Sequence, residues 1–154
     1  MAKFSGYNTN STPVINANNN NLNLMGTAAI RATVQETTWG GGASSSTPME
    51  TAWQRTSTAG TTPPASATIA RLDQTIISSL GNLATCLANA AWATGPTKVA
   101  GALFGCAWNA YGGVVRWLAA PGEEWDLALT TNGIVCPAVV GTGVSTYHCI
   151  WTEY

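Results

Sequence analysis

The only histidine of the chain, His148, is the side chain best suited to general-base chemistry at neutral pH. It follows Ser145 and Thr146 closely, so a serine nucleophile activated by this histidine is the first chemistry to consider. Such a triad also needs a carboxylate that orients the imidazole. The only aspartates, Asp73 and Asp126, stand in no recognisable motif, and no Gly-x-Ser-x-Gly elbow is present. We therefore predict a strand histidine that bonds locally or faces solvent, and no catalytic residue.

Two adjacent carboxylates, Glu123 and Glu124, follow a Pro121-Gly122 turn. Paired carboxylates can hydrolyse glycosides when they face one another across the scissile bond. Adjacent residues of a strand point to opposite faces of its sheet, however, which separates these two groups. We therefore predict a solvated turn and strand edge, where charge also discourages unwanted strand pairing.

The four cysteines are spread over the second half of the chain, at Cys86, Cys106, Cys136 and Cys149. They form no Cys-x-x-Cys pair, and a single histidine does not complete a zinc site, so we expect no metal and no cofactor. Free cysteine behaves as a small buried hydrophobe, which is the role we predict for these thiols. The alternative is a disulfide between Cys136 and Cys149, if these residues lie on adjacent strands.

The composition favours a single domain with an uncharged surface. The chain has 154 residues, of which 45% are hydrophobic and only 8% charged, and its net charge is −1. Without a basic patch, nucleic-acid binding is not expected, and no apolar run approaches the ~20 residues of a membrane span. The N-terminus also lacks the apolar stretch of a secretory signal. So little charge predicts a surface that is neutral and polar or is covered by neighbouring subunits.

Seven tryptophans accompany this low charge. Aromatic side chains dominate both protein cores and subunit interfaces, so we expect them mainly in these two places. The alternative is a surface on which the rings stack against sugars, as in lectins built on β-sandwiches. The tryptophans are Trp39, Trp53, Trp92, Trp108, Trp117, Trp125 and Trp151.

Residues 1–26 differ from the remainder because asparagine crowds them, and asparagine favours turns and irregular structure over strands. The scattered apolar residues of this stretch predict an extended N-terminal arm that packs on a neighbouring subunit. The alternative is a disordered tail. The residues expected to make the partner contact are Phe4, Tyr7, Val14, Ile15, Leu22, Leu24 and Met25.

Residues 27–154 carry the strand signals. Apolar residues alternate with polar ones from residue 28. The runs at 49–56 and 114–118 also read as strands, and Gly/Pro turns separate these runs. A final hairpin is expected from 134–140 and 144–154, and spacing of three and four residues predicts one short helix within 70–90. The fold class is therefore mainly β: an antiparallel β-sandwich or barrel-like, jelly-roll-type domain at 27–154 behind the N-terminal arm.

Several segments of this pattern, in this order, resemble the short β-rich structural proteins of tailed-bacteriophage particles. The resemblance covers Ile30 to Tyr154 and is most specific within 116–134. Its segments are Trp53–Thr61, with the loop Thr58-Ala59-Gly60-Thr61, then Arg116–Glu124, Thr131–Val135 and Trp151–Tyr154.

This resemblance implies a non-enzymatic virion protein that brings no catalytic or metal residues. The leading expectation is a capsid decoration or cement protein that stabilises the phage head. The alternatives are a tail or tail-tip subunit and, from another class, a carbohydrate-binding module of a receptor-binding protein. We expect it to bind itself, as a trimer, and the major capsid protein or another virion protein, and to reside in the virion after assembly in the host cytoplasm. We expect neither a nucleic-acid nor a membrane partner.

Overall fold

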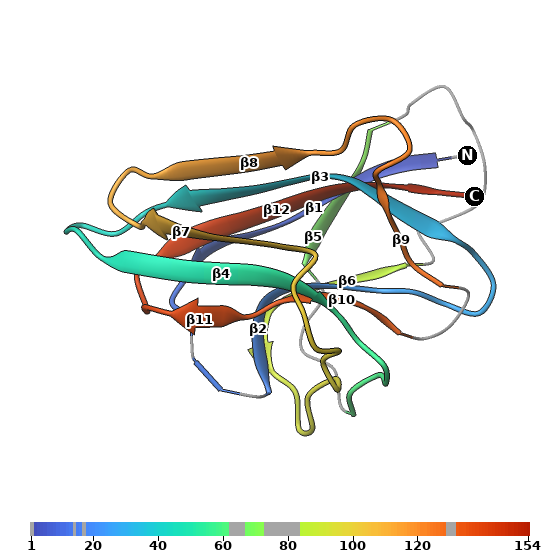
Figure 1. Ribbon diagram of the computed structural model, residues 1–154, viewed down its shortest axis with the longest axis horizontal. Helices are drawn as coiled ribbons and strands as arrows, with labels where there is room; N and C mark the ends of the chain where they lie inside the picture. Colours follow the sequence, from blue (N-terminus) through green and yellow to red (C-terminus); the bar gives the residue numbers. More distant parts are fainter. Residues whose placement is uncertain (1, 14, 17, 62–66, 73–83, 129–131) are drawn as a thin grey trace.

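The computed structural model of the protein describes residues 2–13, 15–16, 18–61, 67–72, 84–128 and 132–154, which form two antiparallel sheets packed face to face (Figure 1). Sheet A has the order β5 (Thr68–Arg71), β1 (Ala2–Ser11), β12 (Ser145–Glu153), β3 (Ala32–Gly41) and β8 (Val114–Leu118), with β9 (Trp125–Asp126) also beside β3. Sheet B has the order β11 (Ala138–Val140), β4 (Pro48–Arg55), β10 (Gly133–Cys136), β2 (Asn19–Met25) and β6 (Thr85–Ala91), with β7 (Phe104–Asn109) also beside β4.

This architecture confirms the predicted β-sandwich. The strands expected at 49–56 and 114–118 appear as β4 and β8. Of the region where a short helix was expected, residues 73–83 lie outside the described residues, and the parts beside them form β5 and β6. Within the described chain no element is a helix long and apolar enough to cross a membrane.

The predicted N-terminal arm is wrong, because residues 2–11 and 19–25 belong to the two sheets. Strand β1 lies between β5 and β12, and β2 lies between β10 and β6. The division of the chain at residue 26 therefore does not separate an arm from a domain. The pairing of Ala2 with Glu153 also brings the two ends of the chain side by side (Figure 1).

Asparagine serves this N-terminal region as a turn former between strands. The Asn16 side-chain oxygen accepts hydrogen bonds from the backbone N–H groups of Asn18 and Asn19, each at 2.8 Å. This local bond pattern is the one that makes asparagine favour turns. It lets the chain leave sheet A after β1 and enter sheet B as β2. Tertiary pairing then overrides the weak strand propensity of the asparagines that follow.

The predicted C-terminal hairpin is also wrong. Gln54 pairs with Val135 and Thr51 with Ala138 in one register, so β10 and β11 continue one another alongside β4. Pro137, which has no N–H to donate, stands at the break between them. The chain then crosses to the other sheet, where β12 pairs with β1 and β3.

A continuous series of aromatic rings joins the two sheets inside the sandwich. Trp117 and Trp125 of sheet A stack with ring centroids 3.9 Å apart. Trp125 also lies 6.1 Å from Trp53 of sheet B, and Trp117 lies 6.5 Å from Phe104 of sheet B. Phe104 in turn stacks on Trp39 at 5.4 Å, which closes the series on sheet A. Such ring pairs contribute about 0.5–1.5 kcal/mol each beyond the area that they bury.

Strand β2 is buried along its whole length although it is rich in asparagine. Asn20 shares a side of β2 with the core residues Leu22 and Leu24, and its side chain is 1% exposed. Neither its amide nitrogen nor its amide oxygen has a hydrogen-bond partner in the structure. A buried polar group without a partner loses its hydration and gains nothing in exchange.

We predict that Asn20→Leu raises the free energy of unfolding by about 1 kcal/mol, because it replaces an unpaired amide with an apolar group of similar size. Urea denaturation followed by tryptophan fluorescence measures the change. The matched control is Asn23→Leu, since Asn23 donates to the Leu87 carbonyl at 3.4 Å and its loss should not stabilise. A destabilised Asn20→Leu protein would show that the amide is satisfied in solution.

Deletion of residues 1–25 should prevent folding, because it removes a strand from within each sheet. The expected result is loss of the cooperative thermal transition and of near-UV circular dichroism. Ile15→Ser serves as the control, since this exposed residue lies between the two strands and its replacement should leave the transition unchanged. A truncated protein that still melts cooperatively would restore the arm hypothesis.

Candidate functional site

Exposed apolar, aromatic and charged side chains lie on the outward side of sheet A. Along each strand they alternate with the residues that face the core. The core-facing set includes Phe4, Trp39, Tyr147, Cys149 and Trp151, so their neighbours along each strand point outward. We name these neighbours the outer face of sheet A. It comprises Tyr7 of β1, Glu36 and Thr38 of β3, Val114, Arg116 and Leu118 of β8, and His148 and Ile150 of β12.

The strand register arranges this face in two cross-strand rows. One row runs across the sheet in the order Arg116, Thr38, His148 and Tyr7, and each residue lies directly opposite the next. In the other, Leu118 lies opposite Glu36, which lies opposite Ile150. Directly opposed side chains have Cβ atoms about 4.5–5.5 Å apart, so each row is a line of neighbouring side chains. These residues are up to 143 positions apart in the sequence, and the pairing of β1, β12, β3 and β8 brings them together.

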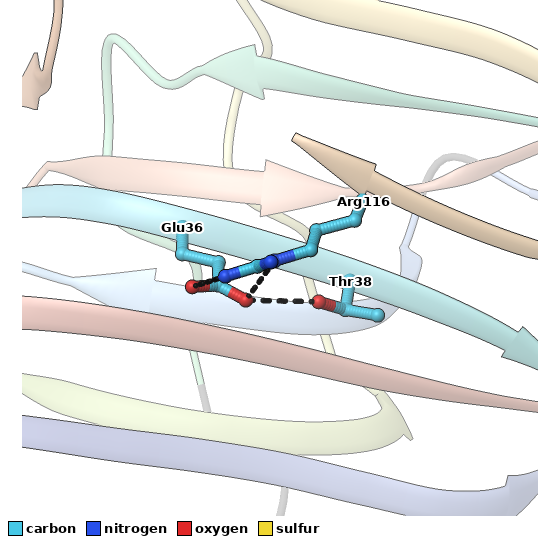
Figure 2. A network of polar contacts seen from close by, with 3 residues as sticks. All are labelled: Glu36, Thr38 and Arg116. Carbon is cyan, nitrogen blue, oxygen red and sulfur yellow. Dashed lines mark hydrogen bonds and ion pairs between the residues drawn. The ribbon is translucent and has the colours of Figure 1, made fainter. Parts of the chain in front are cut away.

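One ion pair connects the two rows (Figure 2). The Arg116 guanidinium donates to both carboxylate oxygens of Glu36, from Nε to Oε1 at 2.7 Å and from Nη2 to Oε2 at 2.9 Å. The Thr38 hydroxyl also lies 3.5 Å from Oε1, as a long donor. The hydrogen bond from Arg116 lowers the pKa of Glu36 and outweighs the effect of partial burial. Two parallel bonds fix the orientation of the guanidinium, although the Arg116 side chain remains 60% exposed.

His148 lies beside this pair and contributes no charge at neutral pH. Partial burial lowers the pKa of its imidazole, and the nearby Glu36 carboxylate opposes this shift only in part. Glu36 and Arg116 compensate one another. The central part of the outer face is therefore polar but electrically neutral at pH 7.

Large aliphatic side chains flank the neutral centre on the edge strand β8. Val114 is 71% exposed and Leu118 is 59% exposed, and Tyr7 at the opposite side of the face is 39% exposed. A hollow of about 190 Å³ adjoins Leu118 and is also lined by Lys3, Pro121 and Ile150. Several large apolar side chains exposed on one face can mark a contact site for a partner. The arrangement fits the binding of another protein surface.

A larger hollow of about 670 Å³ lies at the border of the same sheet. Its lining includes Arg31, Glu124, Asp126 and Tyr154, and the Tyr154 side chain is 53% exposed. Asp126 is held in place there, because its Oδ1 accepts a 2.6 Å hydrogen bond from the Thr33 hydroxyl. An exposed aromatic ring beside charged hydrogen-bonding groups is an arrangement that can bind a polar ligand.

The residues predicted to contact a partner are not brought together. Phe4, Leu22, Leu24 and Met25 are buried in the chain's own cores and cannot contact a neighbour, which corrects the prediction for these residues. Tyr7 lies on the outer face of sheet A, and Ile15 is exposed between β1 and β2. Val14 lies outside the described residues.

The candidate chemical groups are likewise separated. Ser145 faces inward, where its hydroxyl bonds the Tyr147 hydroxyl at 3.1 Å and the Gly143 carbonyl at 3.2 Å, whereas His148 lies on the outer face. Glu124 accepts a hydrogen bond from the backbone N–H of Gly122 at 2.8 Å and so closes the local turn. The described residues contain no group of three or more His, Cys, Asp or Glu side chains that could hold a metal ion.

The tryptophans do not form a sugar-stacking surface. Trp39, Trp53, Trp92, Trp125 and Trp151 are buried, and Trp108 and Trp117 are partly buried against the core. The thiols are free, as predicted. Cys136 lies on β10 of sheet B and Cys149 on β12 of sheet A, so the adjacent strands required for a disulfide between them are not found.

Sequence reasoning missed Val114, Leu118 and the Glu36–Arg116 pair as candidate contact residues. The sequence of 114–118 held part of the signal, because Arg116 beside Trp117 indicates which side of the strand faces outward. The pairing of β3 with β8 held the remainder, and no local pattern reveals it. No protein-family model matches the chain, and comparisons with curated proteins and with solved structures give no match either.

The outer face predicts a pH dependence of stability that one substitution should remove. Because burial lowers the pKa of His148 below its usual 6.5, the unfolded chain takes up this proton first as the pH falls. The free energy of unfolding should therefore decrease between about pH 7 and pH 5, and His148→Gln should remove that part of the decrease. Urea denaturation at several pH values measures both. If the free energy of unfolding falls equally with pH in the two proteins, His148, the only histidine, does not cause the decrease.

Proposed function

We propose that this chain is a non-enzymatic structural protein of a virus particle, and that it decorates and stabilises the head of a tailed bacteriophage. The observation that carries the proposal is the outer face of sheet A, where Val114 and Leu118 stand exposed on either side of a neutral centre. The resemblance of the segments within 116–134 to phage structural proteins supports the same function. Strand β8 provides both the exposed residues and the start of that stretch.

The physical role of such a face is to cover a joint between shell subunits. Burial of exposed aliphatic side chains against a partner lowers the free energy by roughly 25 cal/mol per Å² of apolar area. The Glu36 carboxylate and the Arg116 guanidinium already bond one another, so a partner need not supply a counter-charge. Each contact of this kind is modest, but repetition over a lattice strengthens attachment through avidity.

The proposed partners are the major capsid protein, or another virion protein, and further copies of this chain. Charge is scarce over the whole sequence, and exposed apolar residues also occur on sheet B, at Val139 and Val140 of β11. A second contact surface there would allow the copies to associate while the outer face of sheet A attaches to the shell. A trimer is the proposed assembly, by analogy with proteins that occupy three-fold positions.

A sugar-binding function is the second candidate, and the hollow at the border of sheet A favours it. Tyr154 offers an exposed ring there, and Arg31, Glu124 and Asp126 offer charged hydrogen-bonding groups. A glycan array probed with the isolated chain tests this function. Binding that is lost in Tyr154→Ala would favour the sugar-binding module over decoration.

The location in the particle separates decoration from a tail role. The experiment is quantitative mass spectrometry of virions and of DNA-filled heads without tails, both from the virus whose genome encodes the chain. Decoration predicts a high copy number in both samples. Presence only in tailed particles would favour a tail or tail-tip subunit, and absence from both would contradict a virion role.

The double substitution Val114→Asp with Leu118→Asp should weaken attachment to heads roughly tenfold or more, because it places charge in a contact that buries apolar side chains. Co-sedimentation of added protein with heads that lack it measures attachment. Val99→Asp is the control, because this exposed valine lies between β6 and β7, outside both proposed contact surfaces. If Val139→Asp on β11 loses attachment while the double variant keeps it, the shell contact lies on sheet B instead.

A further inference from the structure

Two of the cysteines meet between the sheets, although neither forms a disulfide. Cys86 lies on β6 of sheet B and Cys149 on β12 of sheet A, and both are fully buried in the same core cluster. Their thiols share a hydrogen bond, which together with burial holds the pKa of Cys149 well above its usual value. The Cys149 thiol is therefore protonated in the folded protein at neutral pH, and burial shields both sulfurs from solvent.

Gly6 creates the space in which these thiols meet. It pairs with Cys149 across β1 and β12, so the side-chain position of residue 6 lies next to the Cys149 side chain. A Cβ at that position would stand 2.4 Å from the Cys86 Sγ and 3.2 Å from its Cβ. The Cys86 side chain thus occupies the place that any other residue at position 6 would fill. Glycine is required here because it lets a thiol of one sheet reach a thiol of the other.

We propose that Cys86 and Cys149 form an oxidisable pair that closes a disulfide between the two sheets when the protein meets a low-molecular-weight disulfide such as oxidised glutathione. The thiolate of one cysteine attacks the oxidant, forms a mixed disulfide and releases one glutathione thiol. The second cysteine then attacks the protein sulfur of that mixed disulfide and releases the other glutathione thiol. The oxidant gains the two electrons that the cysteines lose, and each cysteine gives up one proton.

The position of β6 provides the route by which the oxidant reaches the pair. Among the described strands β6 pairs with β2 alone, so its separation from the sandwich breaks one strand ladder and the hydrogen bond from the Ala67 N–H to the Cys86 carbonyl. Separation exposes Cys86 before Cys149, because β12 is held between β1 and β3. Oxidation should therefore be slow in the folded protein and begin at Cys86.

The remaining cysteines, Cys106 and Cys136, lie on other strands. The Cys136 sulfur accepts a 3.3 Å hydrogen bond from the Trp39 indole N–H, and burial raises the pKa of this thiol to about 12. Cys106 is partly buried on β7, where desolvation raises its pKa as well. These two cysteines provide matched controls for the experiment.

The bond should stabilise the fold by closing a long loop. Cys86 and Cys149 are 63 positions apart, and a cross-link over such a distance removes much of the freedom of the unfolded chain. The oxidised protein should melt roughly 5 to 15 °C higher than the reduced one. Reduction with dithiothreitol should reverse the shift.

The experiment is to incubate the full chain with oxidised glutathione in native buffer, then map its disulfides by mass spectrometry and record its melting temperature. We expect a Cys86–Cys149 linkage in the parent protein and in the double variant Cys106→Ser with Cys136→Ser. Cys86→Ser and Cys149→Ser should each lose both the linkage and the rise in melting temperature.

Three outcomes would overturn the proposal. One is a linkage between Cys106 and Cys136 instead, and another is the absence of any linkage while the thiols react freely after denaturation. The third is a Cys86–Cys149 linkage that lowers the melting temperature, since the pair would then not fit the native geometry. Gly6→Ala adds an independent check, because displacement of Cys86 by the new methyl group should slow formation of the linkage several-fold.

Discussion

The packing of aromatic rings between the sheets is the interaction on which the remaining structure depends. Trp39, Trp117 and Trp125 come from sheet A, and Trp53 and Phe104 come from sheet B, so the rings of the two layers interleave. Each ring removes a large apolar area from water. A register shift of one residue would turn a tryptophan outward, so this core fixes the register of β3, β8 and β9.

The outer face of sheet A follows from that fixed register. Because Val115 and Trp117 face the core, Val114, Arg116 and Leu118 must face outward along β8. The same constraint on Trp39 and Tyr147 places Thr38 and His148 outside, and the Glu36–Arg116 pair forms across strands that the core has already aligned. The candidate site is therefore a consequence of core packing and needs no local motif to specify it.

Local sequence signals predicted some strands, and the prediction failed where the pairing of distant strands decides the fold. The runs that form β4 and β8 are short and are bounded by Gly or Pro, which can be read directly. β2 could not be predicted, because its asparagines disfavour strands. This segment is a strand because it pairs with β10 on one side and with β6 on the other. The ion pair joins residues 80 positions apart, and no local pattern predicts such a contact.

The position of Arg116 also decides how a partner could use β8. An edge strand with exposed aliphatic residues invites another strand to add to its free backbone groups. Arg116 stands at the middle of β8, and its two bonds to Glu36 hold the guanidinium over the sheet. Pairing with a second β8 about its middle would place Arg116 opposite its own copy, where two long side chains must share the outer side of the sheet. A partner should therefore cover the face of sheet A and leave the free edge of β8 unpaired, as the proposed attachment to a shell requires.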